Sequence, residues 1–531
     1  MTVLLPRIIS DRNHVVSGTL MVAGILLTTL AEAITGTILS LGRNNIIGDI
    51  HATPDEFAWL DVGYTTSKLI AFTTAHALSS RIEVRRLLVG ASLLMGLACA
   101  VAPATTRLDL LIALRIAQGF SGGTLLVAGQ TLLFIAYPRR FQPILQALFA
   151  MGAVVAPATA APALQGWLLD IQSWSWVFFC AVPFALAGAG ILMLAESPQS
   201  TGGAKRPFDW LGIVLISTAQ FCFSYVLSQG SRWNWFEEPR IGWLSGLGAV
   251  AFVGFILQQA AAKDRGLLTF TCFRSQDFLF AFIVSFVAGA ALFGSAYLIP
   301  AFAASVLGFT PTAAGQLLLP SGAPFIAALL VAAVLMQFRR IPPIATVPFG
   351  ILMVMTAMWM LSGSTSESGT ADMMSAVLLR GFGLGFLFLS ITLIAFGNLG
   401  RHALASGIGI FNMGRQVGGL IGVAALQTLI DRNLVANATV LNAHISSGSL
   451  AVNERLTAVA TMLSGKGLDT AAAVQGARSL LGKAVAVQST VIAFNTAFIA
   501  VALLFVAAVP VLVAVKIALV RFNKRPPRRD S

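Results

Sequence analysis

Long apolar runs separated by short polar loops recur along almost the whole chain. A helix needs about 20 apolar residues to cross about 30 Å of hydrocarbon at 1.5 Å per residue. By this criterion we expect fourteen membrane-spanning helices, at about residues 16–42, 57–78, 86–103, 109–136, 143–166, 175–195, 208–228, 241–262, 277–306, 312–337, 343–363, 372–397, 402–429 and 484–519. They group as six, two and six, which predicts an all-α polytopic membrane protein.

This grouping predicts two six-helix bundles around a central pathway, with a transmembrane hairpin inserted between them. We therefore assign residues 1–200 to an N-terminal bundle, 201–265 to the inserted hairpin and 266–531 to a C-terminal bundle. The pattern of spans is the basis for this division, because the two halves show no strong internal sequence identity.

One outer segment, residues 430–483, is much longer than the other loops. Leu456, Val459 and Leu463 share one helix face, Gly465-Lys466-Gly467 breaks the chain, and Asp469 or Thr470 can cap a second helix. We expect a periplasmic helical hairpin that leads into the last span. Two functions remain open for it: a docking surface for a periplasmic adaptor, or a lid over the outer mouth of the bundle.

Composition agrees with a membrane protein. The 531 residues are 57% hydrophobic and only 10% charged, and the mean hydropathy is +0.84, against about 25% charged residues in soluble proteins. The net charge of +13 does not indicate nucleic acid as a partner, because the basic residues gather in alternate loops, as they do on the cytoplasmic side of membrane proteins. The basic tail KRPPRR is expected to contact the lipid surface.

The positions of these basic residues predict that both termini are cytoplasmic, in the inner membrane of a bacterium. Arg81, Arg85, Arg139, Arg140 and Arg339 are among those in loops on the N-terminal side of the membrane. The first apolar run resembles a signal peptide, but it continues past its Ala-x-Ala site, so we expect an uncleaved first span.

The sequence favours a secondary transporter over an enzyme or an ATP-driven pump. Its four cysteines are isolated in apolar segments, and its five histidines are dispersed, so no metal or catalytic cluster is indicated. A G-x-x-x-x-G-K-[ST] phosphate-binding loop is absent from the sequence. We expect no cofactor, with a proton gradient as the driving force.

Three charged residues lie deep inside the predicted spans of the first bundle, where charge is costly and usually functional. Glu32 in the first span and Lys68 in the second lie at the same predicted depth, and Arg115 lies in the fourth. In one interpretation Glu32 exchanges between Lys68, Arg115 and a proton, and so couples proton movement to transport. In the other, Glu32 and Lys68 form a permanent structural pair.

Other charged residues suggest gating or structural roles. Asp61 and Arg43, near the outer ends of the first two spans, form either an outer latch or an ordinary surface pair. Arg380 and Arg415 stand beside glycines in the second bundle, where they either meet anionic groups of a substrate or hold backbone carbonyls; Arg380 lies nearer the outside. Asp209 is expected to cap the first helix of the inserted hairpin.

Several motifs together resemble the EmrB/QacA-type, fourteen-span drug:proton antiporters of the major facilitator superfamily, over nearly the whole length. Arg115 to Gly119 matches the R-x-x-Q-G motif of the family's fourth span. The other matching segments are Trp174 to Phe179, Phe208 to Gly212, Asn234 to Phe236, Val306 to Pro311, Leu379 to Gly385 and Asn412 to Gly419.

The chain also departs from the family pattern. The aspartate of the first-span motif aligns with Thr35, and Glu32 lies three residues earlier on the same helix face. The antiporter motif G-x-x-x-G-P-x-x-G-G keeps Gly152 and Pro157, but alanines replace its other glycines. Because alanine is small, we expect close packing and a kink at Pro157 to persist.

The resemblance implies proton-driven efflux of amphipathic or aromatic compounds by alternating access, with a periplasmic adaptor and an outer-membrane channel as candidate partners. Proton-coupled uptake and a non-transporting receptor or assembly subunit remain as alternatives. The residues assigned to the substrate path are Thr35, Gln118, Gly119, Gly122, Tyr297, Phe302 and Arg415.

Overall fold

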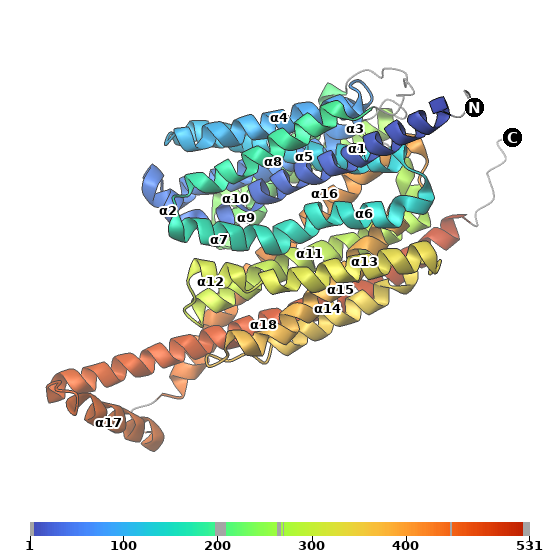
Figure 1. Cartoon of the computed structure of the whole chain (residues 1–531). Helices are drawn as coiled ribbons and strands as arrows, with labels where there is room; N and C mark the ends of the chain where they lie inside the picture. Colours follow the sequence, from blue (N-terminus) through green and yellow to red (C-terminus); the bar gives the residue numbers. More distant parts are fainter. Residues whose placement is uncertain (1–4, 197–208, 263–266, 269, 446–448, 524–531) are drawn as a thin grey trace.

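The computed structural model describes residues 5–196, 209–262, 267–268, 270–445 and 449–523, and within these ranges it contains helices and no strand (Figure 1). The predicted basic tail and residues 201–208 of the predicted hairpin segment lie outside the described residues. Twelve of the described helices are long and apolar enough to cross a membrane.

The other two predicted spans correspond to α3 (Pro54–Ser79) and α16 (Arg401–Ala443). Both are long enough to cross a membrane, since the 26 residues of α3 rise about 39 Å at 1.5 Å per residue. Polar side chains lower the hydropathy of α3, among them Asp55, Asp61 and Lys68. Both helices pack inside the assembly, α3 along α5 and α16 along α11, so the structure is consistent with fourteen spans.

The N-terminal bundle is built around α5. Helix α3 and helix α4 pack along α5, and α8 packs against α1 and α4. Its fifth span is continuous but changes helix type in the middle. The elements are α1 (Leu5–Thr37), α2 (Leu39–Ile50), α3, α4 (Val84–Val101), α5 (Leu108–Ala136), α6 (Gln142–Ala150), the π-helix η3 (Met151–Ala160), α7 (Ala161–Ile171) and α8 (Ser175–Leu194).

The C-terminal bundle repeats this arrangement around α11 and α15. Helix α11 packs on α16 and α18, and α15 packs on α13 and α14. The elements are α11 (Gln276–Ser305), α12 (Pro311–Gln316), α13 (Gly322–Phe338), α14 (Val347–Leu361), α15 (Thr370–Phe396), α16 and α18 (Thr470–Asn523).

The inserted hairpin consists of α9 (Trp210–Gln229) and α10 (Pro239–Ala262), and α9 contacts both α3 and α16. Asp209 caps α9 by accepting a hydrogen bond from the backbone N–H of Gly212 at 2.9 Å. The same carboxylate accepts from the side-chain amides of Gln258 and Gln259, both at 2.8 Å, and from the backbone N–H of Leu267 at 3.2 Å. Asp209 therefore joins both helices of the hairpin to the chain that follows them.

The predicted outer hairpin is present and projects away from the bundles. Helix α17 (Leu450–Ser464) packs on the first part of α18, beyond the end of the bundle that carries α2 and α12 (Figure 1). In this part of α18, Ala473 and Ala477 are buried, whereas α17 has no buried residue. The first turns of α1 and the last turns of α18 both lie at the opposite end of the molecule (Figure 1).

The two bundles touch each other at both ends of the seam between them. Toward the end that carries the termini, the rings of Phe134 on α5 and Phe396 on α15 meet edge to face, with 5.6 Å between centroids. Toward the end that carries α17, the hydroxyl of Thr312 on α12 donates to the carbonyl of Gly166 on α7 at 2.7 Å, and it also bonds the carboxylate of Asp170.

Candidate functional site

The glycines of α5 bring this helix unusually close to α3. A Cβ atom at Gly119 would lie 2.1 Å from the carbonyl oxygen of Tyr64, and one at Gly123 would lie 2.5 Å from the carbonyl oxygen of Lys68. A Cβ at Gly122 would lie 2.9 Å from Cγ of Glu32. Side chains at these positions would push the helices apart, so the glycines create the space in which the charged cluster forms.

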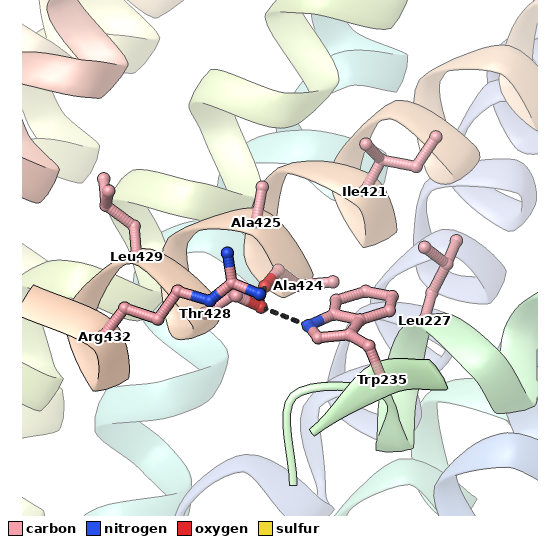
Figure 2. Close-up of a pocket in the computed structure, with 8 residues that line it drawn as sticks. All are labelled: Leu227, Trp235, Ile421, Ala424, Ala425, Thr428, Leu429 and Arg432. Atoms are coloured by element: carbon pink, nitrogen blue, oxygen red, sulfur yellow. Dashed lines mark hydrogen bonds between the residues drawn. The ribbon is translucent and has the colours of Figure 1, made fainter. Parts of the chain in front are cut away.

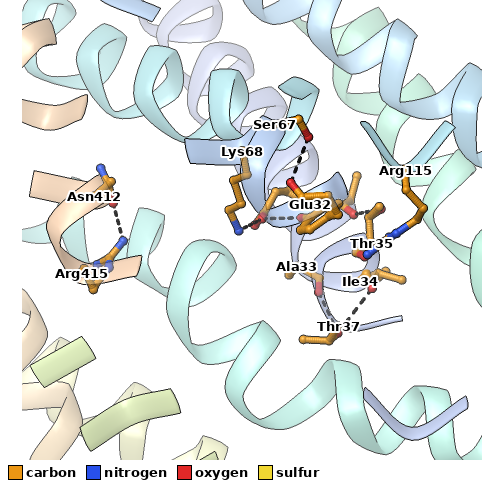
Figure 3. A network of polar contacts seen from close by, with 12 residues as sticks. Glu32, Ala33, Ile34, Thr35, Thr37, Ser67, Lys68, Arg115, Asn412 and Arg415 are labelled. Atoms are coloured by element: carbon orange, nitrogen blue, oxygen red, sulfur yellow. Dashed lines mark hydrogen bonds and ion pairs between the residues drawn. The ribbon is translucent and has the colours of Figure 1, made fainter. Parts of the chain in front are cut away.

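Glu32 and Lys68 form a buried ion pair, at the matching depth that the sequence predicts. The ammonium of Lys68 lies 2.5 Å from Oε1 of Glu32, and the side chains are 12% and 3% exposed. Tyr64, one helical turn before Lys68, donates its hydroxyl to the same carboxylate oxygen at 3.1 Å. Figure 3 shows this cluster between α1 and α3. Glu32 therefore accepts hydrogen bonds from two side chains of α3.

Arg115 lies next to this cluster without an ion pair to Glu32. Its guanidinium carbon lies 4.2 Å from the centroid of the Tyr64 ring, which is a favourable position for a cation over an aromatic face. Its Nη1 donates to the backbone carbonyl of Thr35 at 3.0 Å and to Oε1 of Gln118 at 3.1 Å. The Thr35 hydroxyl is bound to the carbonyl of Ala31 at 2.7 Å.

Arg115 nevertheless has hydrogen-bonding capacity to spare. It is 1% exposed, and its Nε and Nη2 find no acceptor among the described residues, nor does the side-chain N–H of Gln118. Buried donors normally have partners. This corner of the site can therefore supply hydrogen bonds to an additional acceptor.

Tyr64, which was not among the residues predicted from the sequence, connects Glu32 with Arg115. Its hydroxyl binds Glu32 and its ring lies under Arg115, so one side chain contacts both. The available signal was its spacing, because residues four apart on a helix share a face and Lys68 is four residues further on.

Arg415 approaches the site from the other bundle. It lies on α16, which packs against α3, and it interacts electrostatically with Glu32 across the seam. Its guanidinium lies 5.6 Å from the centroid of the Phe388 ring, and its Nη2 donates to Oδ1 of Asn412. Figure 3 shows Arg415 and Asn412 on the Lys68 side of the cluster.

Asn412 begins a chain of buried amides that leads from Arg415 toward the end carrying the termini. Asn412 donates to Gln130 at 3.3 Å, Gln130 to Gln146 at 3.0 Å and Gln146 to Gln142 at 3.2 Å. Gln142 donates at 3.0 Å to the carbonyls of Leu133 and Tyr137, at the end of α5. We call these four side chains, Gln142, Gln146, Gln130 and Asn412, the amide ladder.

Every bond in the amide ladder points the same way, from Arg415 toward the cytoplasmic end predicted from the sequence. Its four members are between 1% and 5% exposed, so each bond lies in a medium of low dielectric, where a lost partner is costly. The bond between Asn412 and Gln130 is the one that joins the two bundles. This ladder was not predicted from the sequence.

Arg380 holds the C-terminal bundle together in the way that Arg115 holds the N-terminal bundle. It is fully buried on α15, the fourth span of its bundle, and donates to the Ser295 hydroxyl at 2.6 Å and to the Leu292 carbonyl at 3.3 Å on α11, the first span. Arg115 likewise joins the fourth span to a carbonyl of the first, that of Thr35. Of the two alternatives for Arg380, the geometry matches the one in which it holds backbone carbonyls.

Several predicted site residues lie away from the charged cluster. Phe302 is completely buried between α11 and α18, with its ring centroid 5.7 Å from that of Phe494 and 6.0 Å from that of Phe498. It contributes to packing rather than to an open path. Tyr297, also on α11, is half-buried against the core.

The predicted outer pair, Arg43 and Asp61, forms no salt bridge among the described residues. The Arg43 guanidinium lies 5.7 Å from the centroid of the Phe57 ring. Pro157 lies inside the π-helix η3. A Cβ at Gly152, in the same element, would lie 2.2 Å from the Thr29 hydroxyl, so this end of η3 packs closely on α1.

Two packed helical bundles with ionisable groups buried at their seam have the architecture of a secondary transporter. The model of the Major Facilitator Superfamily matches residues 21–423, and the chain belongs to this superfamily.

Similar proteins confirm the resemblance to EmrB-type transporters. The multidrug export protein EmrB of Haemophilus influenzae is 26% identical over 432 residues, which cover 80% of this chain and 83% of the relative. The fatty acid resistance protein FarB of Neisseria gonorrhoeae is 23% identical and covers 91% and 93%. The crystal structure of the human organic anion transporter MFSD10 matches with a TM-score of 0.53 at 13% identity, over 79% of this chain and 93% of that one, which supports the fold alone.

Proposed function

We propose that this protein exports amphipathic or aromatic compounds across a bacterial inner membrane in exchange for protons, by alternating access. The names of EmrB-type relatives support export, and one structural observation carries the proton coupling. Glu32 is the one carboxylate among the buried described residues, and it is ion-paired at the seam between the bundles. A group that can gain and lose a proton there can change how the bundles hold each other.

Protonation of Glu32 is the central step of the proposed mechanism. A proton on this carboxyl group removes the charge that pairs with the Lys68 ammonium and that attracts Arg415 across the seam. The bundles then lose one electrostatic contact and can move relative to each other. Deprotonation toward the other side of the membrane restores the pair and resets the transporter.

The amide ladder forms the cytoplasmic closure in this mechanism. Opening that side of the seam must break the bond between Asn412 and Gln130, which joins the two bundles. Because Asn412 also accepts a hydrogen bond from Arg415, a cargo that engages Arg415 weakens the ladder at its first member. Cargo binding and opening are thus linked through one asparagine.

The charges inside the spans favour neutral or anionic cargo over cations. Arg115 and Arg380 are fully buried and Lys68 and Arg415 partly so, against the single buried carboxylate of Glu32. A lipophilic cation would be repelled in this field, whereas a carboxylate gains from it. The spare donors of Arg115 and Gln118 favour the same chemistry.

The position and exposure of the outer hairpin favour its role as a docking surface for a periplasmic protein. It projects beyond the bundle rather than covering it (Figure 1), and it exposes apolar side chains such as Leu450 and Met462, which are 74% and 50% exposed. Exposed apolar groups on a projecting element are typical of interaction surfaces. We assign this surface to an adaptor that continues the export path to an outer-membrane channel.

Transport into sealed vesicles tests the proposal. Purified protein in proteoliposomes with an imposed pH gradient should move an aromatic carboxylate in the direction opposite to protons, and Glu32→Gln should abolish the dependence on the gradient. Glu83→Gln, at a carboxylate outside the spans whose side chain is 22% exposed, is the matched control and should transport normally. Cargo movement in the same direction as protons would instead establish uptake by symport, and absence of transport in every direction would support a receptor or assembly subunit.

A further inference from the structure

An apolar groove lies outside the seam, between the inserted hairpin and the C-terminal bundle. Its volume is about 340 Å³, and Leu227, Ile421, Ala425 and Leu429 are among the residues that line it (Figure 2). Leu227 of α9 and Trp235 of the segment between α9 and α10 form one wall, and residues of α16 form the other. The indole N–H of Trp235 closes one side by donating to the Thr428 hydroxyl at 2.9 Å.

A single charged residue lies at the end of this groove. Arg432 belongs to its lining, and Figure 2 shows its guanidinium extended toward Thr428 and Trp235. Arg432 is exposed, and it forms no salt bridge among the described residues. The neighbouring Asp431 is instead bound by the Ser231 hydroxyl at 2.8 Å. The groove therefore combines an apolar floor with one cation that has no carboxylate partner there.

The groove extends from the headgroup level of the outer leaflet into its acyl-chain region. Arg432 lies just beyond the predicted end of the α16 span, and Ile421 lies eleven residues deeper, which is about 16 Å along the helix. Trp233 and Phe236, which flank Trp235, are 37% and 72% exposed, as aromatic residues at a membrane–water boundary commonly are. A headgroup at Arg432 can thus continue into an acyl chain that lies in the groove.

We propose that this groove binds a bilayer phospholipid with an anionic headgroup, whose phosphate pairs with Arg432 and whose acyl chain fills the space between α9 and α16. Bilayer lipid is the most concentrated amphiphile at this surface, so mass action favours it over a free acid. Because α9 contacts both α3 and α16, the lipid joins the inserted hairpin to the C-terminal bundle at a point remote from Glu32. The inference depends on the membrane-spanning fold and not on the proposed transport.

Native mass spectrometry of the full-length protein in detergent tests the site, with phosphatidylglycerol and phosphatidylcholine of identical acyl chains as probes. The wild-type protein should retain phosphatidylglycerol about fivefold better, the preference expected for one arginine at a membrane surface. Arg432→Gln should remove this preference and Arg432→Lys should keep it. Ala425→Trp, which fills the groove from an exposed position, should weaken retention of both lipids.

Val250→Trp is the matched control for the added indole, because Val250 is 72% exposed on α10 and lies outside the groove lining; its lipid retention should equal that of the wild type. Equal retention of the two lipids by the wild-type protein, or an unchanged preference in Arg432→Gln, would overturn the proposal. Displacement of phosphatidylglycerol by an equal concentration of laurate would overturn it as well, because the groove would then select a single-chain acid.

Discussion

Replacing Lys68 by methionine removes the ammonium from the buried pair while keeping an unbranched apolar side chain. Glu32, only 2% exposed, then keeps one hydrogen bond, from the Tyr64 hydroxyl. Breaking a buried ion pair from one side costs about 3–5 kcal/mol because a charge is left without compensation. Since the Lys68 side chain is 12% exposed and Tyr64 remains, we expect the lower end, about 3 kcal/mol.

The double variant Glu32→Gln/Lys68→Met separates this effect from lost packing. It removes both charges of the pair, so it should recover most of the stability that Lys68→Met loses.

Denaturant unfolding in detergent, followed by tryptophan fluorescence, measures the free energies of unfolding of the wild type and the two variants. Arg86→Gln is the matched control: Arg86 lies 3.1 Å from Glu83, but its side chain is 77% exposed, so the variant should stay within about 0.5 kcal/mol of the wild type. If Lys68→Met proved as stable as the wild type, or the double variant as unstable as Lys68→Met, the electrostatic account of this site would be wrong.

Three further outcomes follow from the packing and the hydrogen bonds. Gly119→Ala should destabilise the protein by about 1–3 kcal/mol because its Cβ would lie 2.1 Å from a carbonyl of α3, whereas Gly90→Ala, where nothing lies within 4 Å, should have no such cost; equal melting temperatures would contradict this. Asn412→Leu should raise the fraction of molecules open on the cytoplasmic side, measured by cysteine accessibility, because it removes the Asn412–Gln130 bond. An unchanged accessibility would show that this bond does not hold the cytoplasmic side closed. Asp209→Ala should cost about 1–2 kcal/mol through the lost cap alone, and a variant with wild-type stability in thermal unfolding would show that the cap is dispensable.

Much of the fold could be predicted from the sequence, because span length and hydropathy depend on the membrane rather than on packing details. The exceptions are informative. Lys68 and its polar neighbours lower the hydropathy of α3, so this helix is recognised less easily than the lipid-facing ones. Pro157, where the sequence predicts a kink, lies inside a ten-residue π-helix, and this helix type was not predicted from the residues.

The candidate site could be predicted only in part. Helix rise gives the depth of a residue, so the pairing of Glu32 with Lys68 follows from their similar distances to the outer ends of two antiparallel spans. Depth does not give rotation about the helix axis, which is why Phe302 was assigned to the substrate path although it faces α18. The amide ladder was hidden for another reason: Asn412 and Gln130 are neutral, common residues, 282 positions apart.

The matched bonds of Arg115 and Arg380 indicate where this molecule can bend. Each guanidinium joins two helices of its own half, Arg115 through the Thr35 carbonyl and Arg380 through the Ser295 hydroxyl and the Leu292 carbonyl, so each half can move as a unit. Substitution of either arginine should therefore lower the stability of one bundle. Substitution of the contacts between the bundles should instead alter only the balance between inward and outward opening. Substitutions at the contacts between the two bundles can therefore shift the balance of inward-open and outward-open states without destabilising either bundle.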